Sequence, residues 1–136
     1  MEAVDIFIKV ALRALQEAEH HMSEADLRSQ IDLDAVRIAM EAPFLTVDGS
    51  LIYPDPVEQA AILAARIIDL VPMPFNVERS TALLFADIRL QNAGLELSAP
   101  ASEIDAVFTA ISNQRIPDDV LIKWFSRRAR LLRTRT

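Results

Sequence analysis

The chain has 136 residues, of which 51% are hydrophobic and 25% charged, and it contains no cysteine. This length and composition predict one domain with a hydrophobic core, and the lack of cysteine excludes disulfide bonds. The sequence contains no stretch of about 18 uncharged apolar residues, so no membrane span is predicted. Its first residues are acidic, whereas a signal peptide begins with basic residues. We therefore expect a single cytoplasmic domain over residues 1–136.

Charge is distributed unevenly along the chain, whose net charge is -6. From Lys123 onward there are 6 of the 14 basic residues, and no acidic residue follows Asp119, so residues 1–122 carry 8 basic and 20 acidic residues. Such a body repels nucleic acid, and only the C-terminal helix could attract it. Alternatively, these cations complement the dipole at a helix C-terminus, and the tail at about residues 127–136 frays.

Three helices are predicted in the first third of the chain. Apolar and charged residues alternate in a helical pattern over residues 4–21. Ser23, followed by acidic residues, is a typical N-cap for a short second helix or turn. A third helix is predicted over about residues 33–42, and it ends before Pro43.

A small β-hairpin is predicted next. Two β-prone runs within residues 44–53 flank Asp48 and Gly49, and an Asp-Gly pair in this position is a strong hairpin signal. Two strands alone are only marginally stable, so we expect this flap to pack on the helices.

Four further helices follow the hairpin. Asp55 caps a helix whose apolar residues surround the axis as far as about Leu70, so this helix should be central and buried. Prolines then interrupt the chain, and a second core helix is predicted from about Val77 to Ala93. Ser102 begins the next helix and residues 117–119 begin the last. The predicted fold class is all-α, with six or seven helices and one hairpin.

The segment around the second core helix resembles the signature of the Fic/Doc family, whose Doc branch contains the death-on-curing toxins. That signature runs H-x-F-x-D-A-N-K-R-T-A and continues into a helix that ends in N-G. Phe75, Thr81 and Ala82 match it when one acidic position is taken as deleted. The family histidine then falls on Met73, and the small residue, asparagine, lysine and arginine fall on Val77, Glu78, Arg79 and Ser80.

The resemblance extends over about residues 27–131. Residues 32–43 are similar to a family helix that ends in L-x-x-A-L-A-R-P, and residues 51–61 are similar to its L-Y-P-D-x-x-E-K-A-A segment. Residues 94–97 match the end of the helix after the motif. The resemblance implies a Fic/Doc-type helical bundle.

The same resemblance implies a transferase reaction, in which a nucleotide or phosphate passes from ATP, with Mg²⁺, to a hydroxyl of a target protein. Doc toxins phosphorylate a translation elongation factor and are bound by a Phd-like antitoxin, part of which folds as a helix into a groove on the toxin. The flap would hold the backbone of the target by strand addition, or it is a plain connecting hairpin. The flap candidates are Thr46, Val47, Asp48, Gly49 and Leu51.

The chemistry of the motif is only partly retained. Met73 cannot accept a proton, and Glu78 adds a negative charge where phosphate would bind. The remaining candidates for a phosphate loop are Phe75, Asn76, Glu78, Arg79 and Ser80. Glu78 could hold a metal in place of the lost acid, or it could simply stabilise the first turn of its helix.

No other catalytic or metal site is indicated by the sequence. The two histidines, His20 and His21, are adjacent, so on a helix they point about 100° apart and cannot chelate one metal together. Glu17 and His21 could form half a metal site or could lie at a solvated helix end.

Three functions therefore stay open. The first is a Doc-like toxin of a toxin–antitoxin system with impaired catalysis, and the second is a catalytically inactive relative that binds or regulates proteins. The third is nucleic-acid binding through the basic residues near the C-terminus, namely Arg127, Arg128, Arg130 and Arg133.

Overall fold

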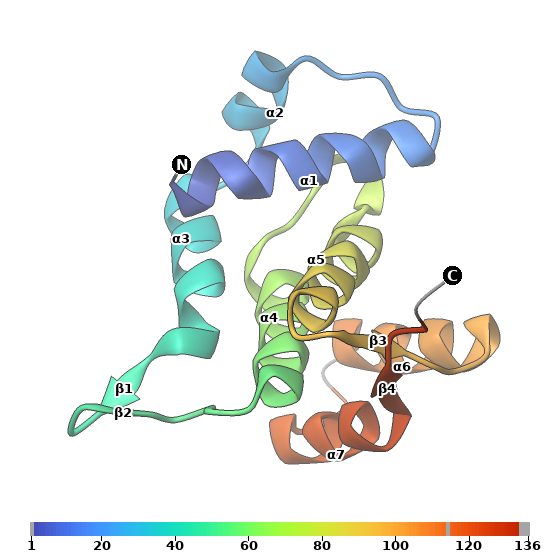
Figure 1. The fold of residues 1–136 in the computed structure, drawn as a ribbon. Helices are drawn as coiled ribbons and strands as arrows, with labels where there is room; N and C mark the ends of the chain where they lie inside the picture. Colours follow the sequence, from blue (N-terminus) through green and yellow to red (C-terminus); the bar gives the residue numbers. More distant parts are fainter. Residues whose placement is uncertain (1, 114, 134–136) are drawn as a thin grey trace.

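The computed structural model describes residues 2–113 and 115–133, which form seven α-helices and two short pairs of antiparallel strands (Figure 1). The helices are α1 (Ala3–Glu17), α2 (Glu24–Gln30), α3 (Leu33–Glu41), α4 (Pro56–Leu70), α5 (Glu78–Asn92), α6 (Ala101–Ser112) and α7 (Asp118–Arg128). The 3-10 turns are η1 (Ala42–Phe44) and η2 (Pro74–Asn76), and the strands are β1 (Thr46–Val47), β2 (Ser50–Leu51), β3 (Leu95–Leu97) and β4 (Ala129–Leu131). None of the described helices is long and apolar enough to cross a membrane.

Helix α4 is the centre of the fold, as its apolar pattern predicts. Helix α5 packs along it, and α3, α6 and α7 also contact it (Figure 1). Ala60, Ala61 and Ala64 are fully buried, and their small side chains let neighbouring helices approach the α4 backbone closely. At its start, the side chain of Asp55 accepts the amide of Val57 and the side chain of Glu58 accepts the amide of Asp55, which is a capping box.

The predicted hairpin is confirmed. Thr46 pairs with Leu51 and Val47 pairs with Ser50 in an antiparallel register. The turn residues Asp48 and Gly49 have φ of 52° and 82°, the positive values that a two-residue hairpin turn needs. The short-range signal in the sequence therefore predicts the turn, and the two-residue turn in the structure fixes the register.

The hairpin is connected to the core through a buried side-chain network at the start of α4. Gln59 is 4% exposed, and its amide donates to the carbonyl of Tyr53 at 2.9 Å. Its Oε1 accepts two hydrogen bonds from Arg89 of α5, at 3.0 and 2.7 Å. This network fixes the chain that leaves the flap against both core helices.

The second pair of strands is not predicted by the sequence. Strand β3 pairs with β4, with Leu95 opposite Leu131 and Leu97 opposite Ala129. Each strand has three residues and no hairpin turn joins them, so the local pattern carries no signal. Within the tail for which fraying from about residue 127 was one expectation, residues 127–128 belong to α7 and residues 129–131 to β4; residues 134–136 lie outside the described residues.

One helix end and one helix start also differ from the prediction. Helix α1 ends at Glu17, before residue 21, because Glu19 has a φ of 64° and the amide of His20 donates back to the carbonyl of Leu15 at 2.8 Å. Helix α6 begins at Ala101 after Pro100, so Ser102 lies inside the helix. The N-cap at Ser23 is confirmed, since its hydroxyl accepts the amide of Asp26 at 3.1 Å.

The ion pair between Arg66 of α4 and Asp118 of α7 gives a test of the packing of these helices. Both oxygens of Asp118 accept from Arg66, at 3.0 and 2.6 Å, and the guanidinium lowers the pKa of Asp118. We expect Asp118→Asn to lower the free energy of unfolding by about 1 kcal/mol at pH 7, allowing for solvent screening of this partly exposed pair.

The pH dependence of this effect follows from the lowered pKa. The stabilisation is present above the unfolded pKa of aspartate, about 3.9, and is lost as the pH falls through the lower folded pKa, so the difference from the parent protein should vanish in acid. Urea denaturation at several pH values measures it. Asp119→Asn, at the exposed neighbouring position, is the control, and an equal or pH-independent loss in both variants would contradict the assignment.

Candidate functional site

The loop between α4 and α5 holds an unusual backbone conformation. Phe75 and Asn76, both in η2, have φ of 58° and 55°, and the amide of Asn76 donates to the carbonyl of Met73 at 3.3 Å. Residues with side chains rarely adopt this left-handed region, although asparagine tolerates it better than phenylalanine. Two such residues in succession are strained, and strain of this kind persists only where surrounding contacts hold it.

Met73, at the position of the family histidine, is buried in the core. Only 6% of its surface is exposed, and its thioether cannot act as a base. Its backbone amide donates to Oε1 of Glu78 at 2.9 Å. The side chain of Met73 therefore offers no base to a substrate. The hydrogen bond from its amide to the carboxylate of Glu78 connects the loop to the first turn of α5.

Glu78 lies where the free amide groups of a helix would attract an anion. It is the first residue of α5, and the N-cap residue Val77 provides no side-chain cap. A carboxylate in a first turn is stabilised by the helix dipole. The protein thus supplies its own anion at this helix start. This agrees with the second of the two roles considered for Glu78 from the sequence, stabilisation of the first turn of its helix.

His20 reaches the same loop from the connection between α1 and α2. Its ring stacks on Phe75 with 4.0 Å between the ring centroids and 9° between the planes. Phe75 is 56% exposed, so this imidazole covers an aromatic ring that would otherwise lie open to solvent. The contact joins residues 55 positions apart, and no local pattern in the sequence predicts it.

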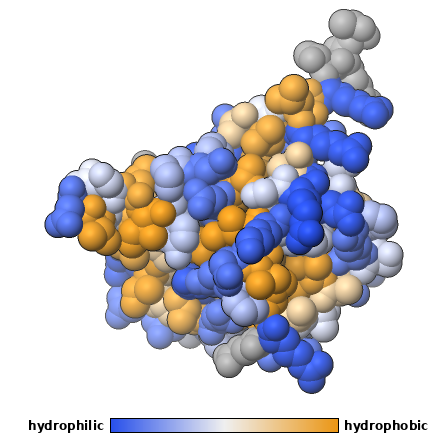
Figure 2. All heavy atoms as spheres, turned by 90° about the horizontal axis from the view of Figure 1, so that it is seen from below, coloured by the Kyte–Doolittle hydropathy of each residue, from blue (hydrophilic) through white to orange (hydrophobic). Residues whose placement is uncertain are grey.

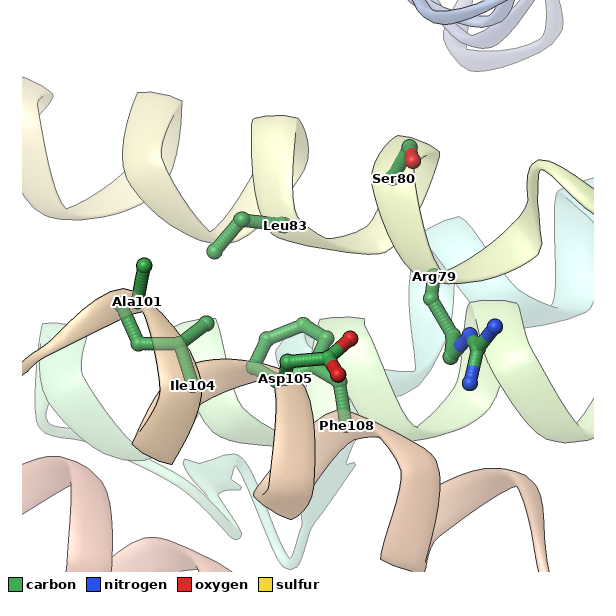
Figure 3. A pocket seen from close by; sticks show the side chains of 7 residues that line it. All are labelled: Arg79, Ser80, Leu83, Ala101, Ile104, Asp105 and Phe108. Carbon is green, nitrogen blue, oxygen red and sulfur yellow. The ribbon is translucent and has the colours of Figure 1, made fainter. Parts of the chain in front are cut away.

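Arg79 lies between two surface cavities. One of its guanidinium nitrogens donates to Oγ1 of Thr109 in α6 at 2.8 Å, which fixes the side chain across the gap between α5 and α6. Arg79 lines a cavity of 190 Å³, which Figure 3 shows, and also a second cavity of 300 Å³. The first is lined by Arg79, Ser80, Leu83, Ala101, Ile104, Asp105 and Phe108, and the second by Ile68, Asn76, Glu78, Arg79 and Ser112.

The phosphate-loop candidates are therefore only partly brought together. Asn76, Glu78, Arg79 and Ser80 line one or both cavities, whereas Phe75 stacks on His20 and lines neither. The matching motif residues Thr81 and Ala82 are fully buried and pack α5 against the core. The apolar cavity wall, formed by Leu83, Ile104 and Phe108, was not expected as part of a site, because apolar residues at helical spacing indicate core packing first.

The flap lies away from these cavities. Its candidates Thr46, Val47, Asp48, Gly49 and Leu51 are all exposed. In Figure 1 the hairpin precedes the start of α4, and the loop with η2 follows the other end of the same helix. None of the flap candidates lines either cavity beside Arg79, so the structure does not bring the two groups of candidates to one site.

The acidic residues and histidines do not form a metal centre in the part of the chain that the structure describes. No group of three or more His, Cys, Asp or Glu residues there could hold a metal ion. Glu17 and His21 thus gain no third ligand among the described residues.

Comparison of the chain with protein-family models, with curated proteins and with solved structures found no match. The Fic/Doc resemblance therefore depends on the residues quoted above.

The stack of His20 on Phe75 predicts a specific effect of mutation. His20→Ala should lower the free energy of unfolding by about 0.5–1.5 kcal/mol and speed amide hydrogen exchange in residues 73–77, because an aromatic contact that covers the strained loop is removed. His21→Ala changes the exposed neighbouring histidine and is the control. Equal effects of the two substitutions on the loop amides would show that the stack does not hold the loop.

Proposed function

We propose that this chain is a Doc-like component of a toxin–antitoxin pair that acts through protein contacts and in which phosphoryl transfer is impaired. The observation that carries the second half of this proposal is the contact between Glu78 and Met73. The residue at the histidine position is a buried methionine, and a carboxylate bonded to its amide lies at the helix start where phosphate would bind.

Typical rate losses support the proposal that phosphoryl transfer is impaired. Loss of a positioned general base typically costs about 10²–10⁴ in rate, and loss of an anion-stabilising donor about 10²–10³. Glu78 adds charge repulsion to any phosphate that approaches the start of α5. In Figure 1 the flap and the loop with η2 adjoin different ends of α4, an arrangement that does not favour transfer to a target held at the flap.

Exposed apolar side chains on and beside the flap support the binding of a protein partner. The group consists of Phe44, Leu45, Val47, Leu51 and Ile52, which are 40–59% exposed. Figure 2 shows hydrophobic residues on the surface of the molecule seen from below. Among the described residues the hairpin has only two strands, so its backbone edges are available to a partner. A Phd-like antitoxin is the partner that the resemblance implies.

Residual transfer from ATP with Mg²⁺ to a translation factor is the second candidate. It is favoured by Arg79, an exposed cation that lines both cavities beside the start of α5. In that case Arg79 would bind phosphate, and Glu78 would hold the metal ion.

Calorimetric titration with ATP and Mg²⁺, and then with GTP, separates the two candidates. We expect no binding to the parent protein up to millimolar nucleotide. Glu78→Gln should gain weak binding, because it removes the charge while its Oε1 can still accept the amide of Met73. Arg79→Ala in the Glu78→Gln background should remove the gain. Micromolar binding by the parent protein that Arg79→Ala abolishes would contradict the first candidate and support the second.

Membership of a toxin–antitoxin pair is tested by co-expression with the product of a short reading frame directly upstream. We expect the two proteins to purify as a complex, and we expect Val47→Lys in the flap to weaken it. Val120→Lys, which changes an exposed valine on α7, should have no effect. The absence of any complex, or equal effects of both substitutions, would contradict binding through the flap.

A further inference from the structure

The cavity of 190 Å³ between α5 and α6 is a second candidate surface for a partner, separate from the flap. Figure 3 shows Leu83 of α5 above it and Ile104 and Phe108 of α6 below it, with Asp105 beside Phe108 and Arg79 toward one end. Phe108 is 2% exposed and forms a fixed apolar floor. The hydrogen bond from Arg79 to Thr109 fixes the polar rim.

The size of this cavity indicates what can occupy it. Sites for cofactors and drug-sized ligands typically have volumes of about 300–1,000 Å³ and bury most of the ligand. This cavity is smaller, and its mouth is formed in part by the exposed residues Arg79, Ser80, Ala101 and Asp105. It suits one large apolar side chain that enters from outside, as an anchor residue of a partner does.

The charges around the cavity indicate what should flank that anchor. Asp105 presents an exposed carboxylate at the rim, and Glu78 lines the cavity on the other side of Arg79. Arg79 donates one hydrogen bond to the neutral hydroxyl of Thr109 and keeps its charge, so the ionisable residues that line the two cavities carry one positive and two negative charges. Residues 1–122 also carry 20 acidic against 8 basic residues. A basic side chain beside the anchor is therefore attracted to this surface, and an acidic one is repelled.

We propose that the α5/α6 cavity anchors one large apolar side chain of a protein partner, from a segment that carries lysine or arginine next to that anchor. This inference names a contact surface for the partner binding proposed above and rests on that function. It places the contact on α5 and α6, whereas the exposed apolar residues of the flap form a different surface.

The test is a nuclear magnetic resonance titration of the isotope-labelled full chain. The probe is a capped helical peptide with one leucine and with lysines in the turns before and after it. The peptide should shift the amide signals of residues 79–83 and 101–108. Replacing its leucine by alanine, or its lysines by glutamates, should weaken binding about tenfold or more, a loss of about 1.4 kcal/mol.

Two variants of the chain, each with a matched control, test the surface itself. Asp105→Lys should reduce the affinity for the peptide, and Asp119→Lys, on α7, should not. Ala101→Phe should fill the cavity and abolish the shifts, and Ala106→Phe, at an exposed position of α6 that does not line the cavity, should leave them unchanged. Unchanged signals elsewhere in the spectrum show that each variant is folded.

The inference is overturned by equal binding of the peptide with glutamates, by insensitivity to Asp105→Lys and Ala101→Phe, or by no shifts up to millimolar peptide. Shifts confined to residues 44–52 would also overturn it, but they would support partner binding at the flap. Nucleotide binding by the parent protein would instead count against the proposed function and would leave the peptide result unaffected.

Discussion

The burial of α4 on all sides is the constraint on which the rest of the structure depends. Alanines at positions 60, 61 and 64 leave room for the backbones of neighbouring helices, so α5, α3 and α7 can surround one axis. The capping box at Asp55 fixes where this helix begins, and Gln59 ties that start to Tyr53 and Arg89. Helix α4 therefore determines where the flap leaves the core at one end and where the loop with η2 begins at the other.

This arrangement has a consequence for chemistry. A transferase of the type that the resemblance implies needs the held target and the phosphate donor at one place. The flap and the start of α5 lie toward different ends of α4, and Met73, which the resemblance aligns with the family histidine, is buried. The cavities beside Arg79 are lined by apolar as well as polar groups. Cavities with such a mixed lining suit the side chains of a protein partner better than they suit a reacting phosphate group.

The sequence predicted the parts of the fold that depend on local signals. Asp48 and Gly49 determined the hairpin turn, Ser23 and Asp55 determined helix starts, and the apolar residues around α4 indicated its burial. The missed features depend on residues far apart in the chain, such as the pairing of β3 with β4 and the stack of His20 on Phe75. The site was also predicted in part. The candidates Asn76, Glu78, Arg79 and Ser80 do line the cavities, but nothing in the local sequence of α6 indicates that its apolar residues form a cavity wall.

The strained loop is held by contacts that also affect whether an anion can bind at the start of α5. Left-handed backbone at Phe75 and Asn76 costs about 1–3 kcal/mol for each residue, and an aromatic stack returns only about 0.5–1.5 kcal/mol. The stack with His20 is therefore insufficient for two such residues, which together cost about 2–6 kcal/mol. A hydrogen bond to a charged group contributes about 1.5–3 kcal/mol, so the stack and one such bond together reach the lower part of this range. The bond from the amide of Met73 to Glu78 is such a contact. Glu78, whose carboxylate would repel an anion at the start of α5, is then also a group that holds the loop, so its complete removal would release the loop.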